Sequence, residues 1–188
     1  LPVIRYSRER LDSVGLAPFK ILIDAGVTGI MPGHLSLPLI DSAENIPATI
    51  SYPILTQLLK NELSFRGLVI SDAMNMVGVI KYTVQGEVEA LALKAGMDVL
   101  EYVTDPEQSI KAIAMKISKG EISPEAITEK CRKVLAAKYW AGLNNIRTVV
   151  TENIREELSK VETKVLIREL YLNSLTLLNN QDSILPVR

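Results

Sequence analysis

Residues 65–76 read Phe-Arg-Gly-Leu-Val-Ile-Ser-Asp-Ala-Met-Asn-Met, and this stretch decides the fold. Leu68, Val69 and Ile70 form an apolar run without polar alternation, which is typical of a strand covered on both faces in a parallel sheet. Asp72 follows where such a strand would end, and in parallel α/β folds the chemistry sits in the loops after the strands. The pattern makes Asp72 a candidate working residue, although an aspartate here can equally cap the next turn.

Two further strands are expected, one before and one after this stretch. A helical pattern over residues 18–26 leads into a strand at residues 27–31, and a helix at residues 87–95 leads into a strand at residues 98–103. The spacing between the three strands suits right-handed crossovers between parallel neighbours. Three strand–helix units in the first two-thirds of the chain therefore predict about half of a parallel barrel.

Several side chains are expected to pack inward. Four apolar side chains share one face of the first helix, which implies that this face packs on the sheet; they are Leu16, Phe19, Leu22 and Ile23. Ile110 begins the apolar stripe of a helix opened by Asp105 and Pro106. Cys131 lies among helical neighbours and is expected to be a small core residue.

Composition narrows the class of partner. The 188 residues carry 21 basic and 22 acidic side chains, a net charge of −1, so nothing indicates binding to nucleic acid or to an acidic membrane surface. A single cysteine excludes an internal disulfide and a multi-cysteine zinc site. No run of 18 apolar residues occurs, so the chain is expected to be soluble. It begins without Met, so an upstream portion is expected, and the compartment, cytoplasmic or periplasmic and secreted, depends on any signal there.

A carboxylate at a strand end supports three kinds of chemistry. It can attack an anomeric carbon, hold a divalent cation, or position water beside a nucleotide phosphate. The nucleotide hypothesis requires a Gly-x4-Gly-Lys-Ser/Thr loop, which is missing from this sequence. The metal hypothesis pairs Asp72 with Glu101 of the next strand, although Glu101 falls midway along that strand and no third carboxylate is apparent.

Two more side chains are candidates for the same site. His34 follows the first strand by a few residues and should open onto the same face as Asp72, either as a hydrogen-bonded structural group or as a proton carrier. Met76 can line an apolar wall of the site or simply fill a gap.

Four short motifs follow one another along the chain. They are a Met-x-x-His element, a Pro-Ala-Thr-x-Ser element, a strand ending in Ser-Asp and followed by Met-x-Gly, and an Ala-x-x-Ala-Gly-x-Asp segment. The residues that carry them are Ile30, Met31, His34 and Pro38; Pro47, Ala48, Thr49 and Ser51; Phe65, Gly67, Ser71, Asp72, Met76 and Gly78; and 92–98. As a set, and in this order, they resemble the barrel domain of glycoside hydrolase family 3 from Leu1 to about Leu143.

The resemblance implies a retaining exo-β-glycosidase, with β-N-acetylglucosaminides as the expected substrates and no metal or organic cofactor. Asp72 matches the family's nucleophile, which forms a covalent glycosyl-enzyme intermediate that water later hydrolyses. His34 matches a histidine near the floor of the site that orients the nucleophile or the ligand, and with Met76 it is expected to bind the substrate. The acid/base residue, a histidine paired with an aspartate, is expected just before Leu1 and outside this chain.

The resemblance also implies a division of the chain. Residues 1–143 are expected to be the C-terminal half of a (β/α)8 TIM-barrel domain, residues 144–178 a helical linker, and residues 179–188 the start of a second α/β domain. Half a barrel exposes two sheet edges, which favours pairing with the missing N-terminal half or with another copy. The isolated chain is expected to be inactive. Two alternatives stay open, a metal-dependent barrel enzyme using Asp72 and Glu101, and a non-catalytic binding module derived from a barrel.

Overall fold

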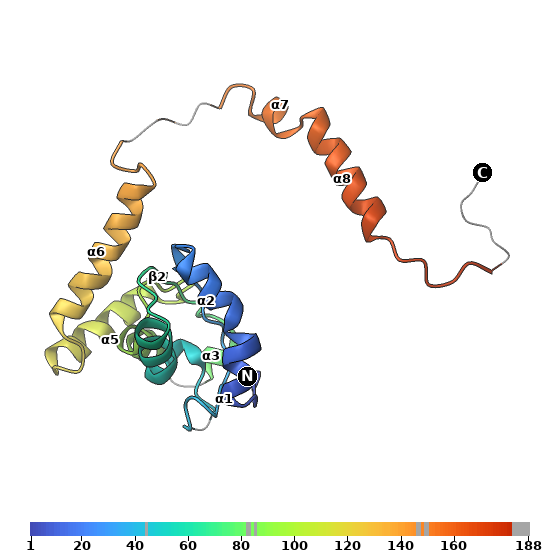
Figure 1. Ribbon diagram of the computed structural model, residues 1–188. Helices are drawn as coiled ribbons and strands as arrows, with labels where there is room; N and C mark the ends of the chain where they lie inside the picture. The colour runs from blue at the N-terminus through green and yellow to red at the C-terminus, as the bar shows by residue number, and fades with distance from the viewer. Residues whose placement is uncertain (44, 82–83, 85, 146–147, 149–150, 182–188) are drawn as a thin grey trace. The chain divides into compact units, whose positions relative to one another are not determined.

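The computed structural model describes residues 1–43, 45–81, 84, 86–145, 148 and 151–181. The chain divides into two compact units, Leu1–Asn144 and Asn145–Arg188. Figure 1 shows the elements of each unit in chain order. The three-part division expected from the sequence stays a prediction.

Short parallel strand segments form the centre of the first unit. β1 (Gly29–Ile30) pairs in parallel with β2 (Leu68–Val69). A parallel bridge between Ile70 and Val99 adds the next segment. The prediction of parallel strands near residues 27, 68 and 98 is confirmed, although the paired stretches are shorter than the strands expected from the sequence.

Helices surround these strands, and several begin where the sequence predicts. Ser7, Asp105 and Ser123 each accept a backbone N–H from the first turn of the helix that follows, which stabilises a helix start by about 1 kcal/mol. The helices of the first unit are α1 (Arg8–Arg10), η1 (Leu11–Gly15), α2 (Ala17–Asp24), η2 (Ala48–Ile50), η3 (Pro53–Glu62), α3 (Val77–Ile80), α4 (Glu87–Ala95), α5 (Pro106–Ser118) and α6 (Pro124–Trp140).

The hydrophobic core lies between η3, α4 and the strand segments. Its buried members are Leu55, Leu59, Phe65, Val69, Met74, Val79, Val88, Ala92, Ala95 and Met97. Gly67 is required beside this core, because a Cβ at this position would collide with the carbonyl oxygen of Thr28 and the ring of Phe65. The core therefore fixes the β2 strand, and with it the loop that carries Asp72.

Three predictions about inward packing are wrong. Phe19 and Leu22 on α2 are 42% and 52% exposed, because α2 turns Ile23 rather than these side chains toward the core. Ile110 is 66% exposed, since α5 packs against α4 and buries Ser109 instead. Cys131 is exposed because α6 directs its lysines inward, as described below.

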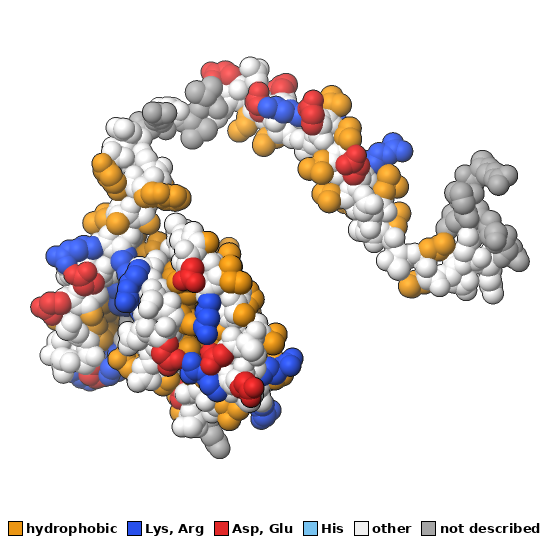
Figure 2. All heavy atoms as spheres, viewed as in Figure 1, with side chains coloured by type: hydrophobic (Ala, Val, Ile, Leu, Met, Phe, Trp, Pro, Cys, Tyr) orange, Lys and Arg blue, Asp and Glu red, His pale blue; other side chains and the backbone are white. Residues whose placement is uncertain are grey.

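The second unit contains α7 (Ile154–Leu158) and α8 (Val161–Ser174). The region expected to be a helical linker thus contains two helices, which are separate because Ser159 and Lys160 leave the helical conformation. Apolar side chains gather along α8 in Figure 2, and none of its residues is buried. Residues 182–188, at the expected start of a second domain, lie outside the described residues. No helix within the described ranges has the length and apolarity that crossing a membrane requires.

Candidate active site

The backbone before and after Asp72 is tied to the neighbouring strand segment. The Ser71 N–H donates to the Val99 carbonyl at 3.0 Å, and the Ser71 hydroxyl accepts the Glu101 N–H at 2.9 Å. The Met74 N–H then donates to the Glu101 carbonyl at 2.9 Å. These three bonds enclose the turn that carries Asp72, so the position of this residue is set by its neighbours rather than by its own side chain.

His34 holds the residue directly after Asp72. The imidazole is buried, with Nε2 lying 3.0 Å from the carbonyl oxygen of Ala73 and Nδ1 lying 2.5 Å from the hydroxyl of Thr49. Because a carbonyl can only accept, Nε2 carries a proton, whereas the threonine hydroxyl can either donate to Nδ1 or accept from it. Both ring nitrogens are therefore engaged by the protein, and the arrangement describes a histidine that positions the loop.

Only one oxygen of the Asp72 carboxylate is hydrogen-bonded within the described residues. Its Oδ1 accepts the Ala73 N–H at 2.7 Å, and the side chain is half-buried. Its Oδ2 has no hydrogen-bond partner within the described part of the chain. One carboxylate oxygen is thus available to a ligand, on a backbone that is fixed on both sides.

A cleft of about 680 Å³ opens beside this carboxylate, a volume within the range of small-molecule sites. Its described lining residues are Leu1, Pro2, Gly33, His34, Leu35, Asn45, Asp72, Met76, Val77, Gly78 and Lys81. Asp72 is the one acidic side chain among them, and Met76 is 45% exposed. The cleft combines a carboxylate, an apolar wall and a cationic rim.

The structure brings the three predicted site residues, Asp72, His34 and Met76, to the same cleft. It does not bring Glu101 there. This side chain is exposed, and the residue contributes to the site through its backbone N–H and carbonyl. Within the described residues no group of three His, Cys, Asp or Glu side chains is placed to hold a metal, so the geometry gives the metal hypothesis no support.

Sequence reasoning missed two contributors to the site. Thr49 lies in the Pro-Ala-Thr-x-Ser motif, but the motif does not indicate that its hydroxyl binds His34. Lys81 follows α3 and lines the cleft, and no motif or spacing marks it. A pairwise contact over such distances in sequence leaves no periodic signal.

Comparison with known proteins assigns the fold. Residues 1–137 match the family described as "Glycosyl hydrolase family 3 N terminal domain". The chain belongs to glycoside hydrolase family 3. The resemblance found from the motifs is therefore confirmed, and this family 3 chain is a mostly helical α/β portion of the barrel domain, a partial barrel.

Relatives of this family 3 chain carry several activities in their names. It is 26% identical over 184 residues to a β-N-acetylglucosaminidase/β-glucosidase from Cellulomonas fimi, covering 94% of the chain and 32% of the relative. It is 30% identical over 186 residues to a probable β-glucosidase C from Aspergillus flavus, covering 92% and 28%. It superposes on a family 3 β-N-acetylglucosaminidase from Paenibacillus sp. str. FPU-7 with a TM-score of 0.83 at 29% identity, covering 96% and 35%. The chain spans about a third of the length of such relatives.

Proposed function

We propose that Asp72 is the nucleophile of a retaining β-glycosidase, whose preferred substrates are terminal β-N-acetylglucosaminides. The observation that carries the proposal is that Asp72 lines a cleft of sugar size after the end of a parallel strand, with an Oδ2 that has no hydrogen-bond partner among the described residues. A nucleophilic carboxylate must be ionised and held still beneath the anomeric carbon. The hydrogen bonds around Ser71 and Ala73 provide that rigidity.

The mechanism proceeds in two displacements. Asp72 attacks the anomeric carbon, the glycosidic bond breaks, and the leaving oxygen takes a proton from a separate acid. Water, deprotonated by the same group, then attacks the glycosyl ester and releases the sugar and the Asp72 carboxylate. The described lining of the cleft holds no second acid. We take these 188 residues to contain the C-terminal half of the barrel, and the acid/base residue is proposed to lie in another part of the complete enzyme. The chain alone is accordingly proposed to be inactive.

His34 and Met76 have different roles in this proposal. His34 is a positioning residue, because its two nitrogens bind Thr49 and Ala73 and leave no free N–H for a sugar. Its ring nevertheless forms part of the cleft surface and so limits where the sugar can lie. Met76 presents its thioether to the cleft and is proposed to pack against the apolar face of the sugar ring.

The choice of sugar has weaker support than the choice of nucleophile. Names of relatives at similar identity include β-N-acetylglucosaminidase, β-hexosaminidase and β-glucosidase. The preference for an amino sugar rests on the Leu1–Ile4 segment, whose sequence resembles the N-acetylglucosaminidase branch, and Leu1 and Pro2 line the cleft. Steady-state rates on matched aryl β-N-acetylglucosaminide and β-glucoside substrates would decide between the two sugars.

Covalent labelling tests the nucleophile directly. The complete protein is incubated with a fluorinated glycosyl fluoride whose glycosyl-enzyme intermediate hydrolyses slowly, and the labelled peptide is sequenced by mass spectrometry. We expect the label on the 65–76 peptide at Asp72, and no label in the Asp72→Asn variant. The matched control is Asp24→Asn, which removes an exposed carboxylate from the end of α2 and should label normally. Label on any other residue would refute the assignment.

A further inference from the structure

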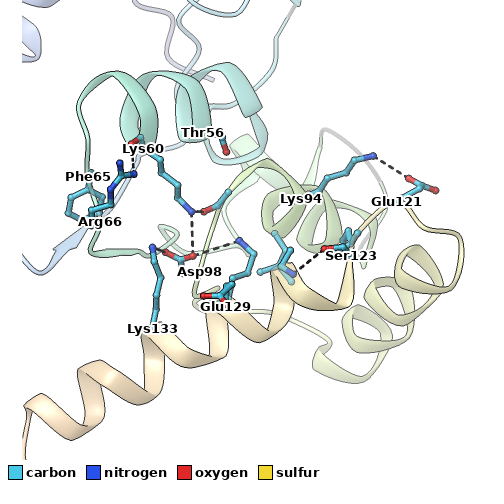
Figure 3. Close-up of a pocket in the computed structure, with 15 residues that line it drawn as sticks. Thr56, Lys60, Phe65, Arg66, Lys94, Asp98, Glu121, Ser123, Glu129 and Lys133 are labelled. Atoms are coloured by element: carbon cyan, nitrogen blue, oxygen red, sulfur yellow. Dashed lines mark hydrogen bonds and ion pairs between the residues drawn. The ribbon is translucent and has the colours of Figure 1, made fainter.

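A second aspartate lies at the opposite end of the strands from Asp72. Asp98 is 8% exposed, and its Oδ2 accepts the Val69 N–H at 3.0 Å. Lys60 of η3 and Lys130 of α6 bring their Nζ atoms to 3.4 Å and 3.7 Å from Oδ1. Lys133 of α6 lies 3.0 Å from Oδ2. Figure 3 shows Lys60 and Lys133 reaching Asp98 from different sides, out of two helices.

This cluster carries an excess of positive charge. Three ammonium groups face one carboxylate, which leaves two positive charges uncompensated. Two other carboxylates line the same pocket but pair elsewhere. Glu121 binds Lys94 at 3.6 Å and Lys116 at 3.1 Å, and Glu129 binds Arg132. Neither is therefore available to neutralise the lysines around Asp98.

The lysines also retain hydrogen-bond donors. Each ammonium group donates to one backbone carbonyl and faces Asp98, which accounts for two of its three N–H bonds. The carbonyls belong to Gly96, Met97 and Gly67, which bind Lys60, Lys130 and Lys133 respectively. Three N–H groups, one from each lysine, are left for a further acceptor.

These groups border a pocket of about 450 Å³. Arg66 and Lys94 also line it, so the rim is cationic as well. Burial, together with the neighbouring charge of Lys60, lowers the pKa of Lys130 to about 8. Burial also lowers the pKa of Lys60, and the attraction of Asp98 only partly offsets it. Like charges therefore lie close together at a partly desolvated site, an arrangement that a bound anion would stabilise.

We propose that this pocket binds a phosphate-type dianion, with Lys60, Lys130 and Lys133 as its ligands. Two negative charges would neutralise the two excess positive charges, and the oxygens of a tetrahedral oxyanion can accept the three remaining N–H bonds. The pocket has room for more than the anion itself, so the phosphate can be inorganic or carried by a small sugar. Because the ligands come from η3 and α6, binding would also stabilise the fold.

The site is separate from the cleft of Asp72. Lys133, one of the lysines around Asp98, binds the carbonyl of Gly67 directly before β2, whereas Asp72 follows the end of that strand. The lining residues of the two pockets do not overlap. Failure of the anion proposal would therefore leave the proposed glycosidase function untouched, and the reverse also holds.

The test is calorimetric titration of the 188-residue chain at pH 7 with sodium phosphate, against sodium chloride at the same ionic strength. We expect saturable phosphate binding and none for chloride. Lys130→Gln and Lys133→Gln should each weaken phosphate binding about tenfold or more, since each removes one charge and one donor. Lys111→Gln, which removes an exposed lysine of α5, should leave it unchanged. A hexose 6-phosphate run in parallel distinguishes the source, because tighter binding than inorganic phosphate indicates a phosphorylated sugar.

Two further measurements use only the wild-type chain, so they test the proposal even if a variant does not fold. Phosphate should raise the melting temperature of the wild-type chain and should protect Lys130 from reductive methylation, with Lys111 methylated equally in both conditions. The proposal is overturned if phosphate acts no differently from chloride on the wild-type chain. It is also overturned if Lys111→Gln weakens binding as much as Lys130→Gln, because the effect would then be general charge screening.

Discussion

Asp72 and Asp98 occupy opposite ends of the same strand pair and are held in opposite ways. Around Asp72 the protein binds the backbone on both sides and leaves a carboxylate oxygen open to a cleft. Around Asp98 the carboxylate itself is the anchor, buried and bound by an amide and three lysines. The difference teaches that the position of the proposed nucleophile depends on its neighbours, whereas the position of Asp98 depends on its own carboxylate oxygens.

The electrostatic environment of Asp98 agrees with an anchoring role. Burial alone would raise the pKa of this carboxyl, but the Val69 N–H, the Lys133 ammonium and the charge of Lys60 together lower it below its usual range. The carboxylate is therefore ionised at neutral pH, and its charge contributes to stability above the pKa it would have in the unfolded chain. That contribution is lost as the pH falls through the lower pKa of the folded state.

The largest expected effect is a loss of catalytic activity, which distinguishes Asp72 from Asp98. Asp72→Asn in the complete enzyme should lower kcat/KM by about 10³-fold or more, because the amide cannot form the glycosyl ester. Its free energy of unfolding should change by less than about 1 kcal/mol, since Oδ2 has no partner to lose within the described residues. Steady-state kinetics and urea unfolding measure the two quantities. A large loss of stability would show that Asp72 is an anchor as well.

The reverse effect is expected for the other aspartate. Asp98→Asn should lower the free energy of unfolding by about 3 kcal/mol, because three lysines would face one another without a buried counter-charge. Urea unfolding of the 188-residue chain measures it. The matched control is Asp105→Asn, whose side chain still caps α5 and should cost far less. Equal costs for the two changes would refute the anchoring role.

A smaller effect is expected from the histidine that positions the Asp72 loop. His34→Gln should lower kcat about tenfold and leave KM nearly unchanged, because it disturbs the Ala73 carbonyl and Thr49 hydroxyl contacts rather than a sugar contact. Thr49→Val should act in the same direction, since it removes the other partner of the ring. If KM rises while kcat is retained, His34 binds substrate directly and the positioning role is wrong.

The smallest effect tests the lysine cluster through pH. Because the folded-state pKa of Lys130 is about 8 and its unfolded value is near 10.5, the unfolded chain binds more protons between these values. Stability from this group is therefore lowest below pH 8 and rises toward pH 10.5. The charges of Lys60, Lys133 and Asp98 act on this group, so the comparison uses the difference between wild type and Lys130→Gln. A pH-independent difference would contradict the lowered pKa.

The sequence predicts those features that rest on local patterns. The apolar run at Leu68–Ile70 identifies the central strand, and the capping residues identify the helix starts. The placement of Asp72 after a strand end, with His34 nearby, also follows from the order of the motifs. These predictions succeed because each depends on a few adjacent residues.

Features that depend on which face a helix presents were not predictable. Apolar spacing on α2 and α5 suggested buried stripes, but the neighbouring elements turned other faces inward and left Phe19, Leu22 and Ile110 exposed. Lys130 and Lys133 of α6 are partly buried against Asp98, and Cys131 between them is exposed. Burial of a lysine depends on a counter-charge supplied from elsewhere in the chain, which has no local signature.

The turn that carries Asp72 depends on the backbone of residue 101 and not on its side chain. Glu101 supports this turn through its amide and its carbonyl alone, and its side chain points to solvent. Nearly any amino acid can therefore occupy the position without moving Asp72. Proline is the exception, because it lacks the N–H that the Ser71 hydroxyl accepts.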